Sequence, residues 1–204
     1  MMKNSTNILK YKRLAPVYDL VFGKILASAR IKVFKSIEFK KGSKVLLMGV
    51  GTGEDIKYIP KDCMCIGIDI SESMLERARK KAGHLNVMFL NMNAEKVDFQ
   101  DSTFDFVILN LILSVAENPD KVLSEANRIL KGNGQIIVFD KFLKKEGKIT
   151  IIRRLVSKIT AFIGTDINRE FEVMVSGMQL SIIRDDALMM GGNYRNILLE
   201  KSVN

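Results

Sequence analysis

The chain has 204 residues, of which 47% are hydrophobic and 27% are charged. This length supports one well-filled core and is too short for two ordinary catalytic domains. With only three prolines and no low-complexity stretch, the composition excludes disorder as a description of most of the chain. No stretch approaches the ~20 apolar residues of a membrane-spanning helix, and the first residues lack the pattern of a signal peptide. Two cysteines cannot build a disulfide framework, so we expect a cytoplasmic protein.

The net charge of +9 is concentrated in two segments. Residues 1–44 carry +9 and residues 141–158 carry +6, whereas residues 45–140 between them carry −4. A basic surface can face nucleic acid, an anionic membrane or an acidic substrate, or it can simply aid solubility. Charge alone does not choose among these partners.

The predicted elements begin with a helix and then alternate. Apolar residues at roughly helical spacing predict a helix over residues 14–38. Short apolar runs then predict buried strands at residues 45–48, 65–70, 86–90, 104–109 and 135–139. Helices are predicted to begin at Glu54, closed off by Pro60, and to cover residues 71–81 and 119–130.

The C-terminal part of the chain has a different pattern. Two strands are predicted at residues 179–184 and 194–201, joined through Gly191 and Gly192, which favours an antiparallel edge. The alternation before them predicts an α/β fold, a mostly parallel sheet with helices on both faces. We expect a single domain over residues 1–204. Its parts are an N-terminal helical cap (1–44), a ligand-binding core (45–140), a substrate-side insertion (141–175) and C-terminal strands (176–204).

A glycine-rich loop follows the first predicted strand. Gly49, Gly51 and Gly53 allow a tight turn and let the backbone approach a ligand with no Cβ in the way, although three glycines can also merely shape a turn. Asp69 follows 20 residues after Gly49, at the end of the next strand, where a carboxylate can accept hydrogen bonds from ribose. The dinucleotide fingerprint needs a glycine where this chain has Glu54, an acid that would repel a pyrophosphate. The loop therefore favours a nucleoside ligand without phosphates.

These motifs resemble those of the class I S-adenosylmethionine (SAM)-dependent methyltransferases over nearly the whole chain. The similar segments are residues 45–53, 67–75, 91–95, 104–107 and 130–134. The resemblance implies a Rossmann-like, mostly parallel seven-stranded sheet with an antiparallel C-terminal hairpin, and SAM as the cofactor. It also implies that Asp69 holds the ribose and that Asn93 lies beside the adenine. The cofactor-binding residues that it implies are Gly49, Val50, Gly51, Gly53, Asp69, Ile70, Met74, Asn93, Ala94 and Asn110.

The chain departs from the family pattern at two of these motifs. Met48 stands where the family usually has an acid that helps to hold the methionine amino group, and Asn93 stands where Asp is common. An asparagine can still accept a hydrogen bond from the adenine amino group. The sequence therefore does not decide which group holds the methionine amino group; backbone carbonyls and Glu54 are the candidates.

Softer similarities concern the methyl acceptor. Residues 11–19 resemble the opening of the quinone C-methyltransferases and the bacterial phosphatidylethanolamine N-methyltransferases, and residues 110–116, 164–168 and 191–195 are more similar to the second group. The resemblance implies a small or amphipathic acceptor, with a phospholipid amine favoured. The alternatives are a quinone precursor, another small molecule, RNA, or a protein that binds SAM without transferring its methyl group.

Candidate catalytic side chains are few. His84 is the only histidine, and we expect it in a solvated loop. The resemblance implies that Tyr11, Tyr18 and Tyr194 line the substrate side, where aromatic faces stabilise a cation. Packing of Tyr18 in the helical core and pairing of Tyr194 in a strand are equally open. No metal site is expected, because the only cysteine pair has no histidine nearby.

The basic segments suggest a surface partner. Residues 141–163 combine Lys and Arg with an apolar stripe, a pattern typical of a helix lying in a membrane interface. With residues 1–44, this segment favours an anionic membrane and a peripheral location at its inner face. A solvated charged face whose stripe packs on the domain is the alternative. Nucleic acid is disfavoured, because the chain has no tryptophan and no separate RNA-binding module. The sequence does not define an oligomeric state.

Overall fold

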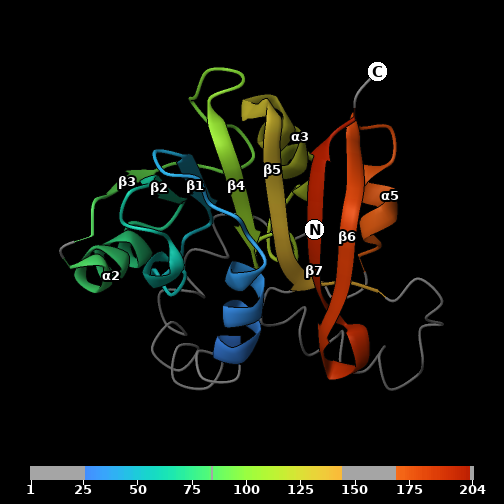
Figure 1. The fold of residues 1–204 in the computed structure, drawn as a ribbon, viewed down its shortest axis with the longest axis horizontal. Coiled ribbons are helices and arrows are strands. Elements are labelled where there is room, and N and C mark those ends of the chain that lie inside the picture. Colours follow the sequence, from blue (N-terminus) through green and yellow to red (C-terminus); the bar gives the residue numbers. More distant parts are fainter. Residues whose placement is uncertain (1–25, 84, 144–168, 203–204) are drawn as a thin grey trace.

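A computed structural model of the chain describes residues 26–83, 85–143 and 169–202 (Figure 1). These residues contain a seven-stranded sheet in the order β3-β2-β1-β4-β5-β7-β6. The strands are β1 (Lys44–Met48), β2 (Met64–Asp69), β3 (Val87–Asn91), β4 (Phe104–Asn110), β5 (Leu130–Lys141), β6 (Leu180–Met189) and β7 (Tyr194–Lys201). The first five strands pair in parallel, and β7 runs antiparallel to both β5 and β6. The predicted α/β class and the antiparallel C-terminal hairpin are both confirmed.

Helices cover both faces of the sheet. A helix of residues 26–35 and α2 (Glu72–Ala82) pack on one face, and α3 (Pro119–Ile129) and α5 (Phe171–Val175) pack on the other (Figure 1). Each strand serves both cores because successive side chains point to opposite faces. In β1, Leu46 belongs to the core under α3, whereas Leu47 belongs to the core under α2.

Local sequence explains where these helices begin. Pro119 stands at the start of α3, where its missing N–H is not needed, and the Asn118 side chain accepts a hydrogen bond from the Lys121 amide. Ser71 precedes α2 as predicted, but its hydroxyl makes no capping bond and pairs instead with the Ser73 hydroxyl. The first helix ends at a turn at Ser36, and residues 14–25 of its predicted span lie outside the described residues.

The helix predicted to begin at Glu54 is wrong. The segment forms only a single 3-10 turn, η1 (Ile56–Tyr58), and Pro60, which restricts the residue before it to extended backbone, stops any continuation as a helix. Strand β5 also begins earlier than predicted, at Leu130, since Leu130 pairs with Phe104 of β4. A second 3-10 turn, η2 (Met190–Gly192), joins β6 to β7.

The parallel strands bring their carboxyl ends to one edge of the sheet. This carboxyl edge collects Met48, Asp69, Asn91, Asn110 and Lys141. The η2 turn and the helix of residues 26–35 lie at the same edge in Figure 1. Ligands of such sheets bind at this edge. Within the described residues, no helix has the length and apolar character needed to cross a membrane.

Candidate functional site

The glycine loop between β1 and η1 adopts backbone angles that favour glycine. The φ angles are +72° at Gly49, +54° at Gly51 and +84° at Gly53. A Cβ at Gly49 would lie 2.6 Å from Cδ1 of Ile112, and one at Gly53 would lie 3.0 Å from Cα of Ala78. The outer two glycines therefore permit close packing within the protein itself.

The middle glycine differs from the other two. Among the described residues, a Cβ at Gly51 would meet nothing nearer than the Gly49 carbonyl oxygen, 4.0 Å away. The backbone at Gly51 thus faces open space, as a ligand cradle requires. Val50 does not share this exposure, because its side chain is buried and packs against Gly67.

Asp69 connects the loop to the end of β2. One of its carboxylate oxygens accepts a hydrogen bond from the Gly51 amide and the other accepts one from the Ser71 amide, both at 2.9 Å. Burial raises the pKa of this carboxyl above its ordinary value, although the N–H groups of Ser71, Gly51 and Ile70 act in the opposite direction. A carboxylate has about four acceptor positions, so Asp69 keeps acceptor capacity beyond these backbone N–H groups, which suits a ribose hydroxyl.

Glu54 is directed away from this cradle. Its carboxylate contacts Nζ of Lys81, which also donates to the Thr52 hydroxyl at 3.0 Å, and lies 3.6 Å from Nζ of Lys57. Burial acts to raise the pKa of Glu54, but the hydrogen bond and charge of Lys81 outweigh it and lower the pKa. Glu54 therefore pins the loop to α2 and leaves the role suggested for it at a methionine amino group without support.

The segment predicted to lie beside the adenine follows β3. The Asn93 side-chain oxygen accepts a hydrogen bond from the Glu95 amide at 2.9 Å, and Ala94 is buried. The predicted residues Ile70 and Met74 follow β2 instead. The Ile70 carbonyl accepts a hydrogen bond from the Asn91 side chain at 3.2 Å, and Met74 is buried on α2.

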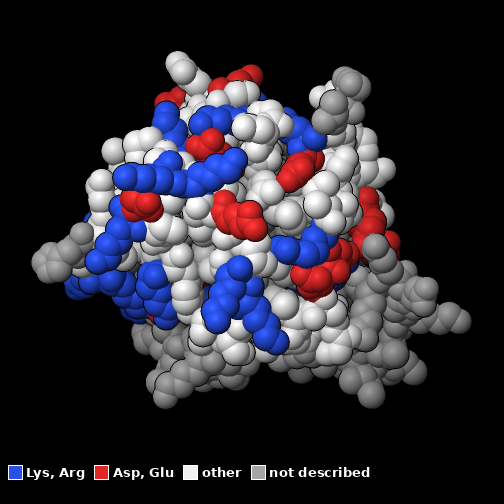
Figure 2. Space-filling view, viewed as in Figure 1, with Lys and Arg blue, Asp and Glu red and all other residues white. Residues whose placement is uncertain are grey.

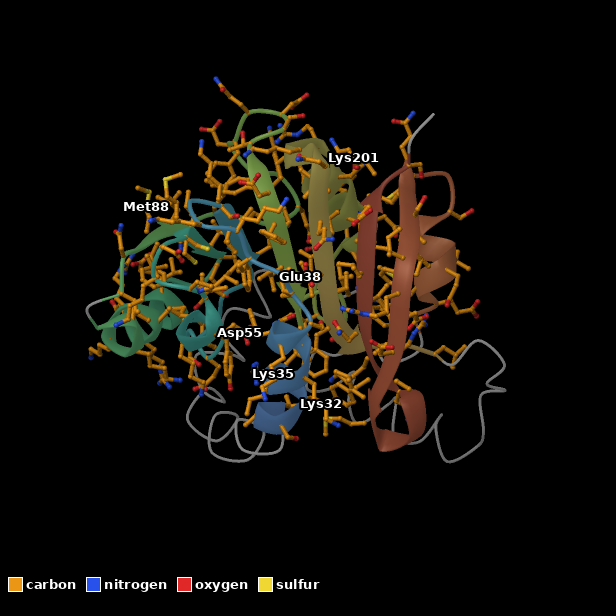
Figure 3. All side chains as sticks on the ribbon, in the orientation of Figure 1. Lys32, Lys35, Glu38, Asp55, Met88 and Lys201 are labelled. Atoms are coloured by element: carbon orange, nitrogen blue, oxygen red, sulfur yellow. The ribbon has the colours of Figure 1, made fainter. Side chains whose placement is uncertain are left out.

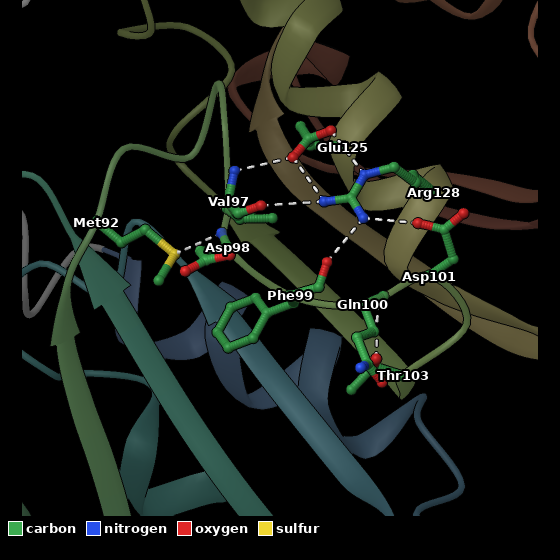
Figure 4. Close-up of polar contacts among 9 residues, drawn as sticks. All are labelled: Met92, Val97, Asp98, Phe99, Gln100, Asp101, Thr103, Glu125 and Arg128. Atoms are coloured by element: carbon green, nitrogen blue, oxygen red, sulfur yellow. Dashed lines mark hydrogen bonds and ion pairs between the residues drawn. The ribbon is translucent and has the colours of Figure 1, made fainter.

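Arg128 of α3 holds the rest of this segment in place (Figure 4). Its guanidinium donates to the carbonyl oxygens of Phe99 and Val97, at 2.7 and 3.0 Å, and pairs with Asp101 and Glu125. The Glu125 carboxylate in turn accepts from the Val97 amide at 2.8 Å. One side chain thus fixes the course of the loop after the adenine-side segment.

A buried polar cluster beside the glycine loop was not predicted from the sequence. Nε of Arg30 donates to Asp55 Oδ1 at 2.7 Å, and Nδ2 of Asn110 donates to Asp55 Oδ2 at 3.0 Å. The three side chains come from the first helix, from the segment after the loop and from the end of β4, and Asp55 is labelled beside that helix in Figure 3. Asn110 was predicted at the site, whereas nothing local in the sequence indicated Arg30 or Asp55.

Tyr194 is the one predicted aromatic candidate within the described residues, since Tyr11 and Tyr18 lie outside them. It pairs with Lys141 across the β5–β7 ladder, is buried, and lies with its ring 5.9 Å from that of Phe139. Nζ of Lys141 lies 5.9 Å from the Tyr194 ring centroid. The structure therefore places Tyr194 in a strand and in the core, with a cation beside its ring.

Two charged residues end β5, of which Asp140 is buried and Lys141 is half-buried. Asp140 is fully buried and accepts from the Ser114 amide at 2.8 Å, and burial raises the pKa of its carboxyl. Burial lowers the pKa of the Lys141 ammonium, against the opposing charge of Asp140. These two residues were not among the predicted site residues.

Arg195 completes the hairpin motif singled out in the sequence. Its guanidinium pairs with Asp185 and Glu172 and lies 5.7 Å from the ring centroid of Phe142 and 5.9 Å from that of Phe171. These contacts join the β6–β7 hairpin to α5, so Arg195 stabilises the packing of the elements around the site.

Comparison with known proteins agrees with this geometry. Residues 46–138 match the model of a methyltransferase domain. The chain is 28% identical over 188 residues to the phosphatidylethanolamine N-methyltransferase of Cereibacter sphaeroides, covering 90% of this chain and 92% of that protein. It is 32% identical over 153 residues to the ubiquinone/menaquinone biosynthesis C-methyltransferase UbiE of Pasteurella multocida, covering 64% of this chain and 56% of that protein.

A solved structure shares the fold. The crystal structure of a SAM-dependent methyltransferase from Thermotoga maritima superposes with a TM-score of 0.73 at 20% identity, covering 95% of this chain and 99% of that one. The sheet order, the glycine loop and the acid at the end of β2 define a SAM-binding α/β domain. Residues 46–138 thus form a methyltransferase domain, and over most of its length the chain is similar to class I SAM-dependent methyltransferases. The domain and the fold imply SAM as the methyl donor.

Proposed function

We propose that this methyltransferase acts on a phospholipid amine of the phosphatidylethanolamine type at an anionic membrane surface. In this proposal SAM lies across the carboxyl edge, with its adenine beside Asn93 and Ala94, its ribose on Asp69 and its sulfur end near Gly51. The open space at Gly51 and the free acceptor positions of Asp69 support this placement.

The observation that carries the choice of acceptor is the extent of the match to the Cereibacter sphaeroides enzyme. That similarity runs through 92% of the relative's length, whereas the match to the quinone C-methyltransferase UbiE covers 56% of its length. Substrate-side segments lie outside the shared SAM-binding core in this fold, so a match that includes them favours the lipid amine. The single-domain organisation over residues 1–204, with cap and insertion covering the acceptor, forms part of the proposal.

The surface at the carboxyl edge supports a membrane partner. The helix of residues 26–35 exposes Ile31, Lys32 and Lys35 together, and Figure 2 shows Lys and Arg side chains over that part of the molecule. Figure 3 labels Lys32 and Lys35 on the outward face of this helix. Cations with an apolar residue between them suit the interface of an anionic bilayer. Of the predicted membrane-facing segments 1–44 and 141–163, residues 1–25 and 144–163 lie outside the described residues.

Methyl transfer from a sulfonium is an in-line displacement, for which bound SAM supplies the electrophile. The chain's own task is to orient the acceptor and exclude water, which can contribute about 7–11 kcal/mol. The acceptor amine must arrive as the free base. Tyr194 is buried beside Lys141 at this edge, and we place the acceptor amine on this side, where an aromatic ring nearby would favour the methylated ammonium. Tyr11 and Tyr18 remain proposed partners there.

The proposal predicts transfer of label from methyl-labelled SAM to phosphatidylethanolamine in anionic vesicles. Lys32→Gln together with Lys35→Gln should weaken vesicle binding about 30-fold, since each lysine near an anionic surface contributes about 1 kcal/mol. The measurements are label in extracted lipid and co-sedimentation with vesicles of phosphatidylethanolamine and phosphatidylglycerol.

Lys201→Gln is the matched control, because Lys201 lies at the opposite end of the sheet in Figure 3. Its vesicle binding should equal that of the unmodified protein. Label appearing only in a demethylated quinone precursor would replace the lipid amine with the quinone as acceptor. Vesicle binding that is unchanged in the double variant would remove this helix from the membrane contact.

A further inference from the structure

The Arg30–Asp55–Asn110 cluster ends in an unpaired oxygen. All three residues are buried, with exposed fractions of 8%, 7% and 7%. Asp55 uses one carboxylate oxygen for Arg30 and the other for Asn110. The remaining polar atom, Oδ1 of Asn110, is buried and has no hydrogen-bond partner among the described residues. A buried acceptor left unpaired is costly, and a donor from a ligand bound at the carboxyl edge would remove that cost.

The cluster fixes which end of the Asn110 amide is free. Because Nδ2 donates to the Asp55 carboxylate, rotating the amide by 180° would bring two acceptors together. Asp55 is held in turn by the charge of Arg30. The chain also turns sharply after Asn110, where Leu111 has a φ of +59°, an uncommon angle for a residue with a side chain. Asn110 is thereby held with its oxygen as the available group.

The order of the strands places this oxygen where the amino-acid end of SAM must lie. The carboxyl edge runs from β3 through β2 and β1 to β4. Asp69 ends β2 and Asn110 ends β4, two strand spacings away, or roughly 10 Å. A ribose on Asp69 therefore directs its methionine chain across the glycine loop toward Asn110. Met48, at the end of the intervening β1, is buried in the core, and its side chain has no oxygen to accept a hydrogen bond.

We infer that Asn110 Oδ1 accepts a hydrogen bond from the α-ammonium of SAM, and that Asp55 and Arg30 are positioning residues that hold the amide in this orientation. The cluster thus takes over the task of the acid that this chain lacks at Met48. Asp55 adds a negative charge behind the amide, while Arg30 balances that charge when no ligand is present. The inference concerns the cofactor and is independent of the acceptor.

The test combines a protein change with a ligand change. S-adenosylhomocysteine and its analogue without the α-amino group are titrated by calorimetry into the full chain and into Asn110→Ala. The unmodified protein should bind the deaminated analogue at least tenfold more weakly than S-adenosylhomocysteine. In Asn110→Ala this difference should shrink to less than threefold, because the acceptor for the amino group is gone.

Asn196→Ala is the matched control, since Asn196 is also a buried asparagine with an unpaired Oδ1 but lies within β7. It should keep the full difference between the two ligands. Asn110→Ser, with folding verified by circular dichroism, replaces Asn110→Ala if that variant does not fold. Equal affinity of the unmodified protein for both ligands, or an undiminished difference in the Asn110 variant, would overturn the inference. Absence of any S-adenosylhomocysteine binding would instead contradict the cofactor assignment.

Discussion

Gly51→Ala will weaken S-adenosylhomocysteine binding about 30-fold while lowering the free energy of unfolding by only about 1–2 kcal/mol. The stability loss comes from a side chain at a φ of +54°, since a Cβ there meets no atom of the described residues nearer than 4.0 Å. The affinity loss comes from the same Cβ entering the space where the cofactor approaches the backbone, and an overpacked contact costs about 1–3 kcal/mol. Calorimetric titration and urea unfolding measure the two quantities separately.

Gly42→Ala is the control for the backbone strain alone. Gly42 has a φ of +78°, and a Cβ there would have no neighbour within 4 Å in the described part of the chain, but the residue precedes β1 at the opposite edge of the sheet. It should lose the same stability as Gly51→Ala and keep full affinity. If Gly51→Ala also keeps full affinity, the cofactor does not approach the loop at that residue.

Gly53→Ala is expected to have the largest effect on stability, a loss of about 3–4 kcal/mol. Its φ of +84° adds about 1–2 kcal/mol of strain. The new Cβ would also lie 2.8 Å from Cδ1 of Ile56 and 3.0 Å from Cα of Ala78, and the second of these atoms belongs to the backbone of α2 and cannot move aside. Urea unfolding followed by circular dichroism measures the loss.

Gly83→Ala is the control that measures the backbone strain of a positive φ without the steric contact expected in Gly53→Ala. Gly83 ends α2 with a φ of +54°, and no atom of the described residues lies within 4 Å of its Cβ position. This variant should lose about 1–2 kcal/mol only. Equal losses in the two variants would mean that the loop can withdraw from α2 without cost.

The strands and the cofactor loop could be predicted because local sequence determines them. The run Val45–Met48 is fully apolar and stops at a glycine, as a buried parallel strand does, and β1 occupies it. Asp69 follows the next such run, and the structure brings its carboxylate to the Gly51 amide. In each case, residues close together in the sequence carry both the element and its chemistry.

Features that depend on distant residues could not be predicted. The buried contact between Arg30 and Asp55 spans 25 positions, and that between Asp55 and Asn110 spans 55. Arg30 looked like one of many basic residues of the N-terminal segment, yet it is buried and neutralised. The short helix α5 was missed because five residues within an insertion show no periodicity, and its buried Phe171 depends on packing against Phe142.

The fold divides the basic residues of the N-terminal segment into buried and exposed ones. Arg30 contributes to the interior of the site, whereas Lys32 and Lys35 face outward from the same helix. One helix thus presents a positioning residue on its inner face and the proposed membrane contact on its outer face. Cofactor binding and membrane binding can be separated by substitutions on these two faces.

The central claim is that SAM lies along the carboxyl edge from Asn93 to Asn110, and a crystal structure of the full chain with S-adenosylhomocysteine tests it most directly. In that structure both ribose hydroxyls should lie within hydrogen-bond distance of the Asp69 carboxylate. The ligand should contact the backbone of Gly51, and its amino group should donate to Oδ1 of Asn110. A ligand bound elsewhere, or a ribose with no contact to Asp69, would contradict the account.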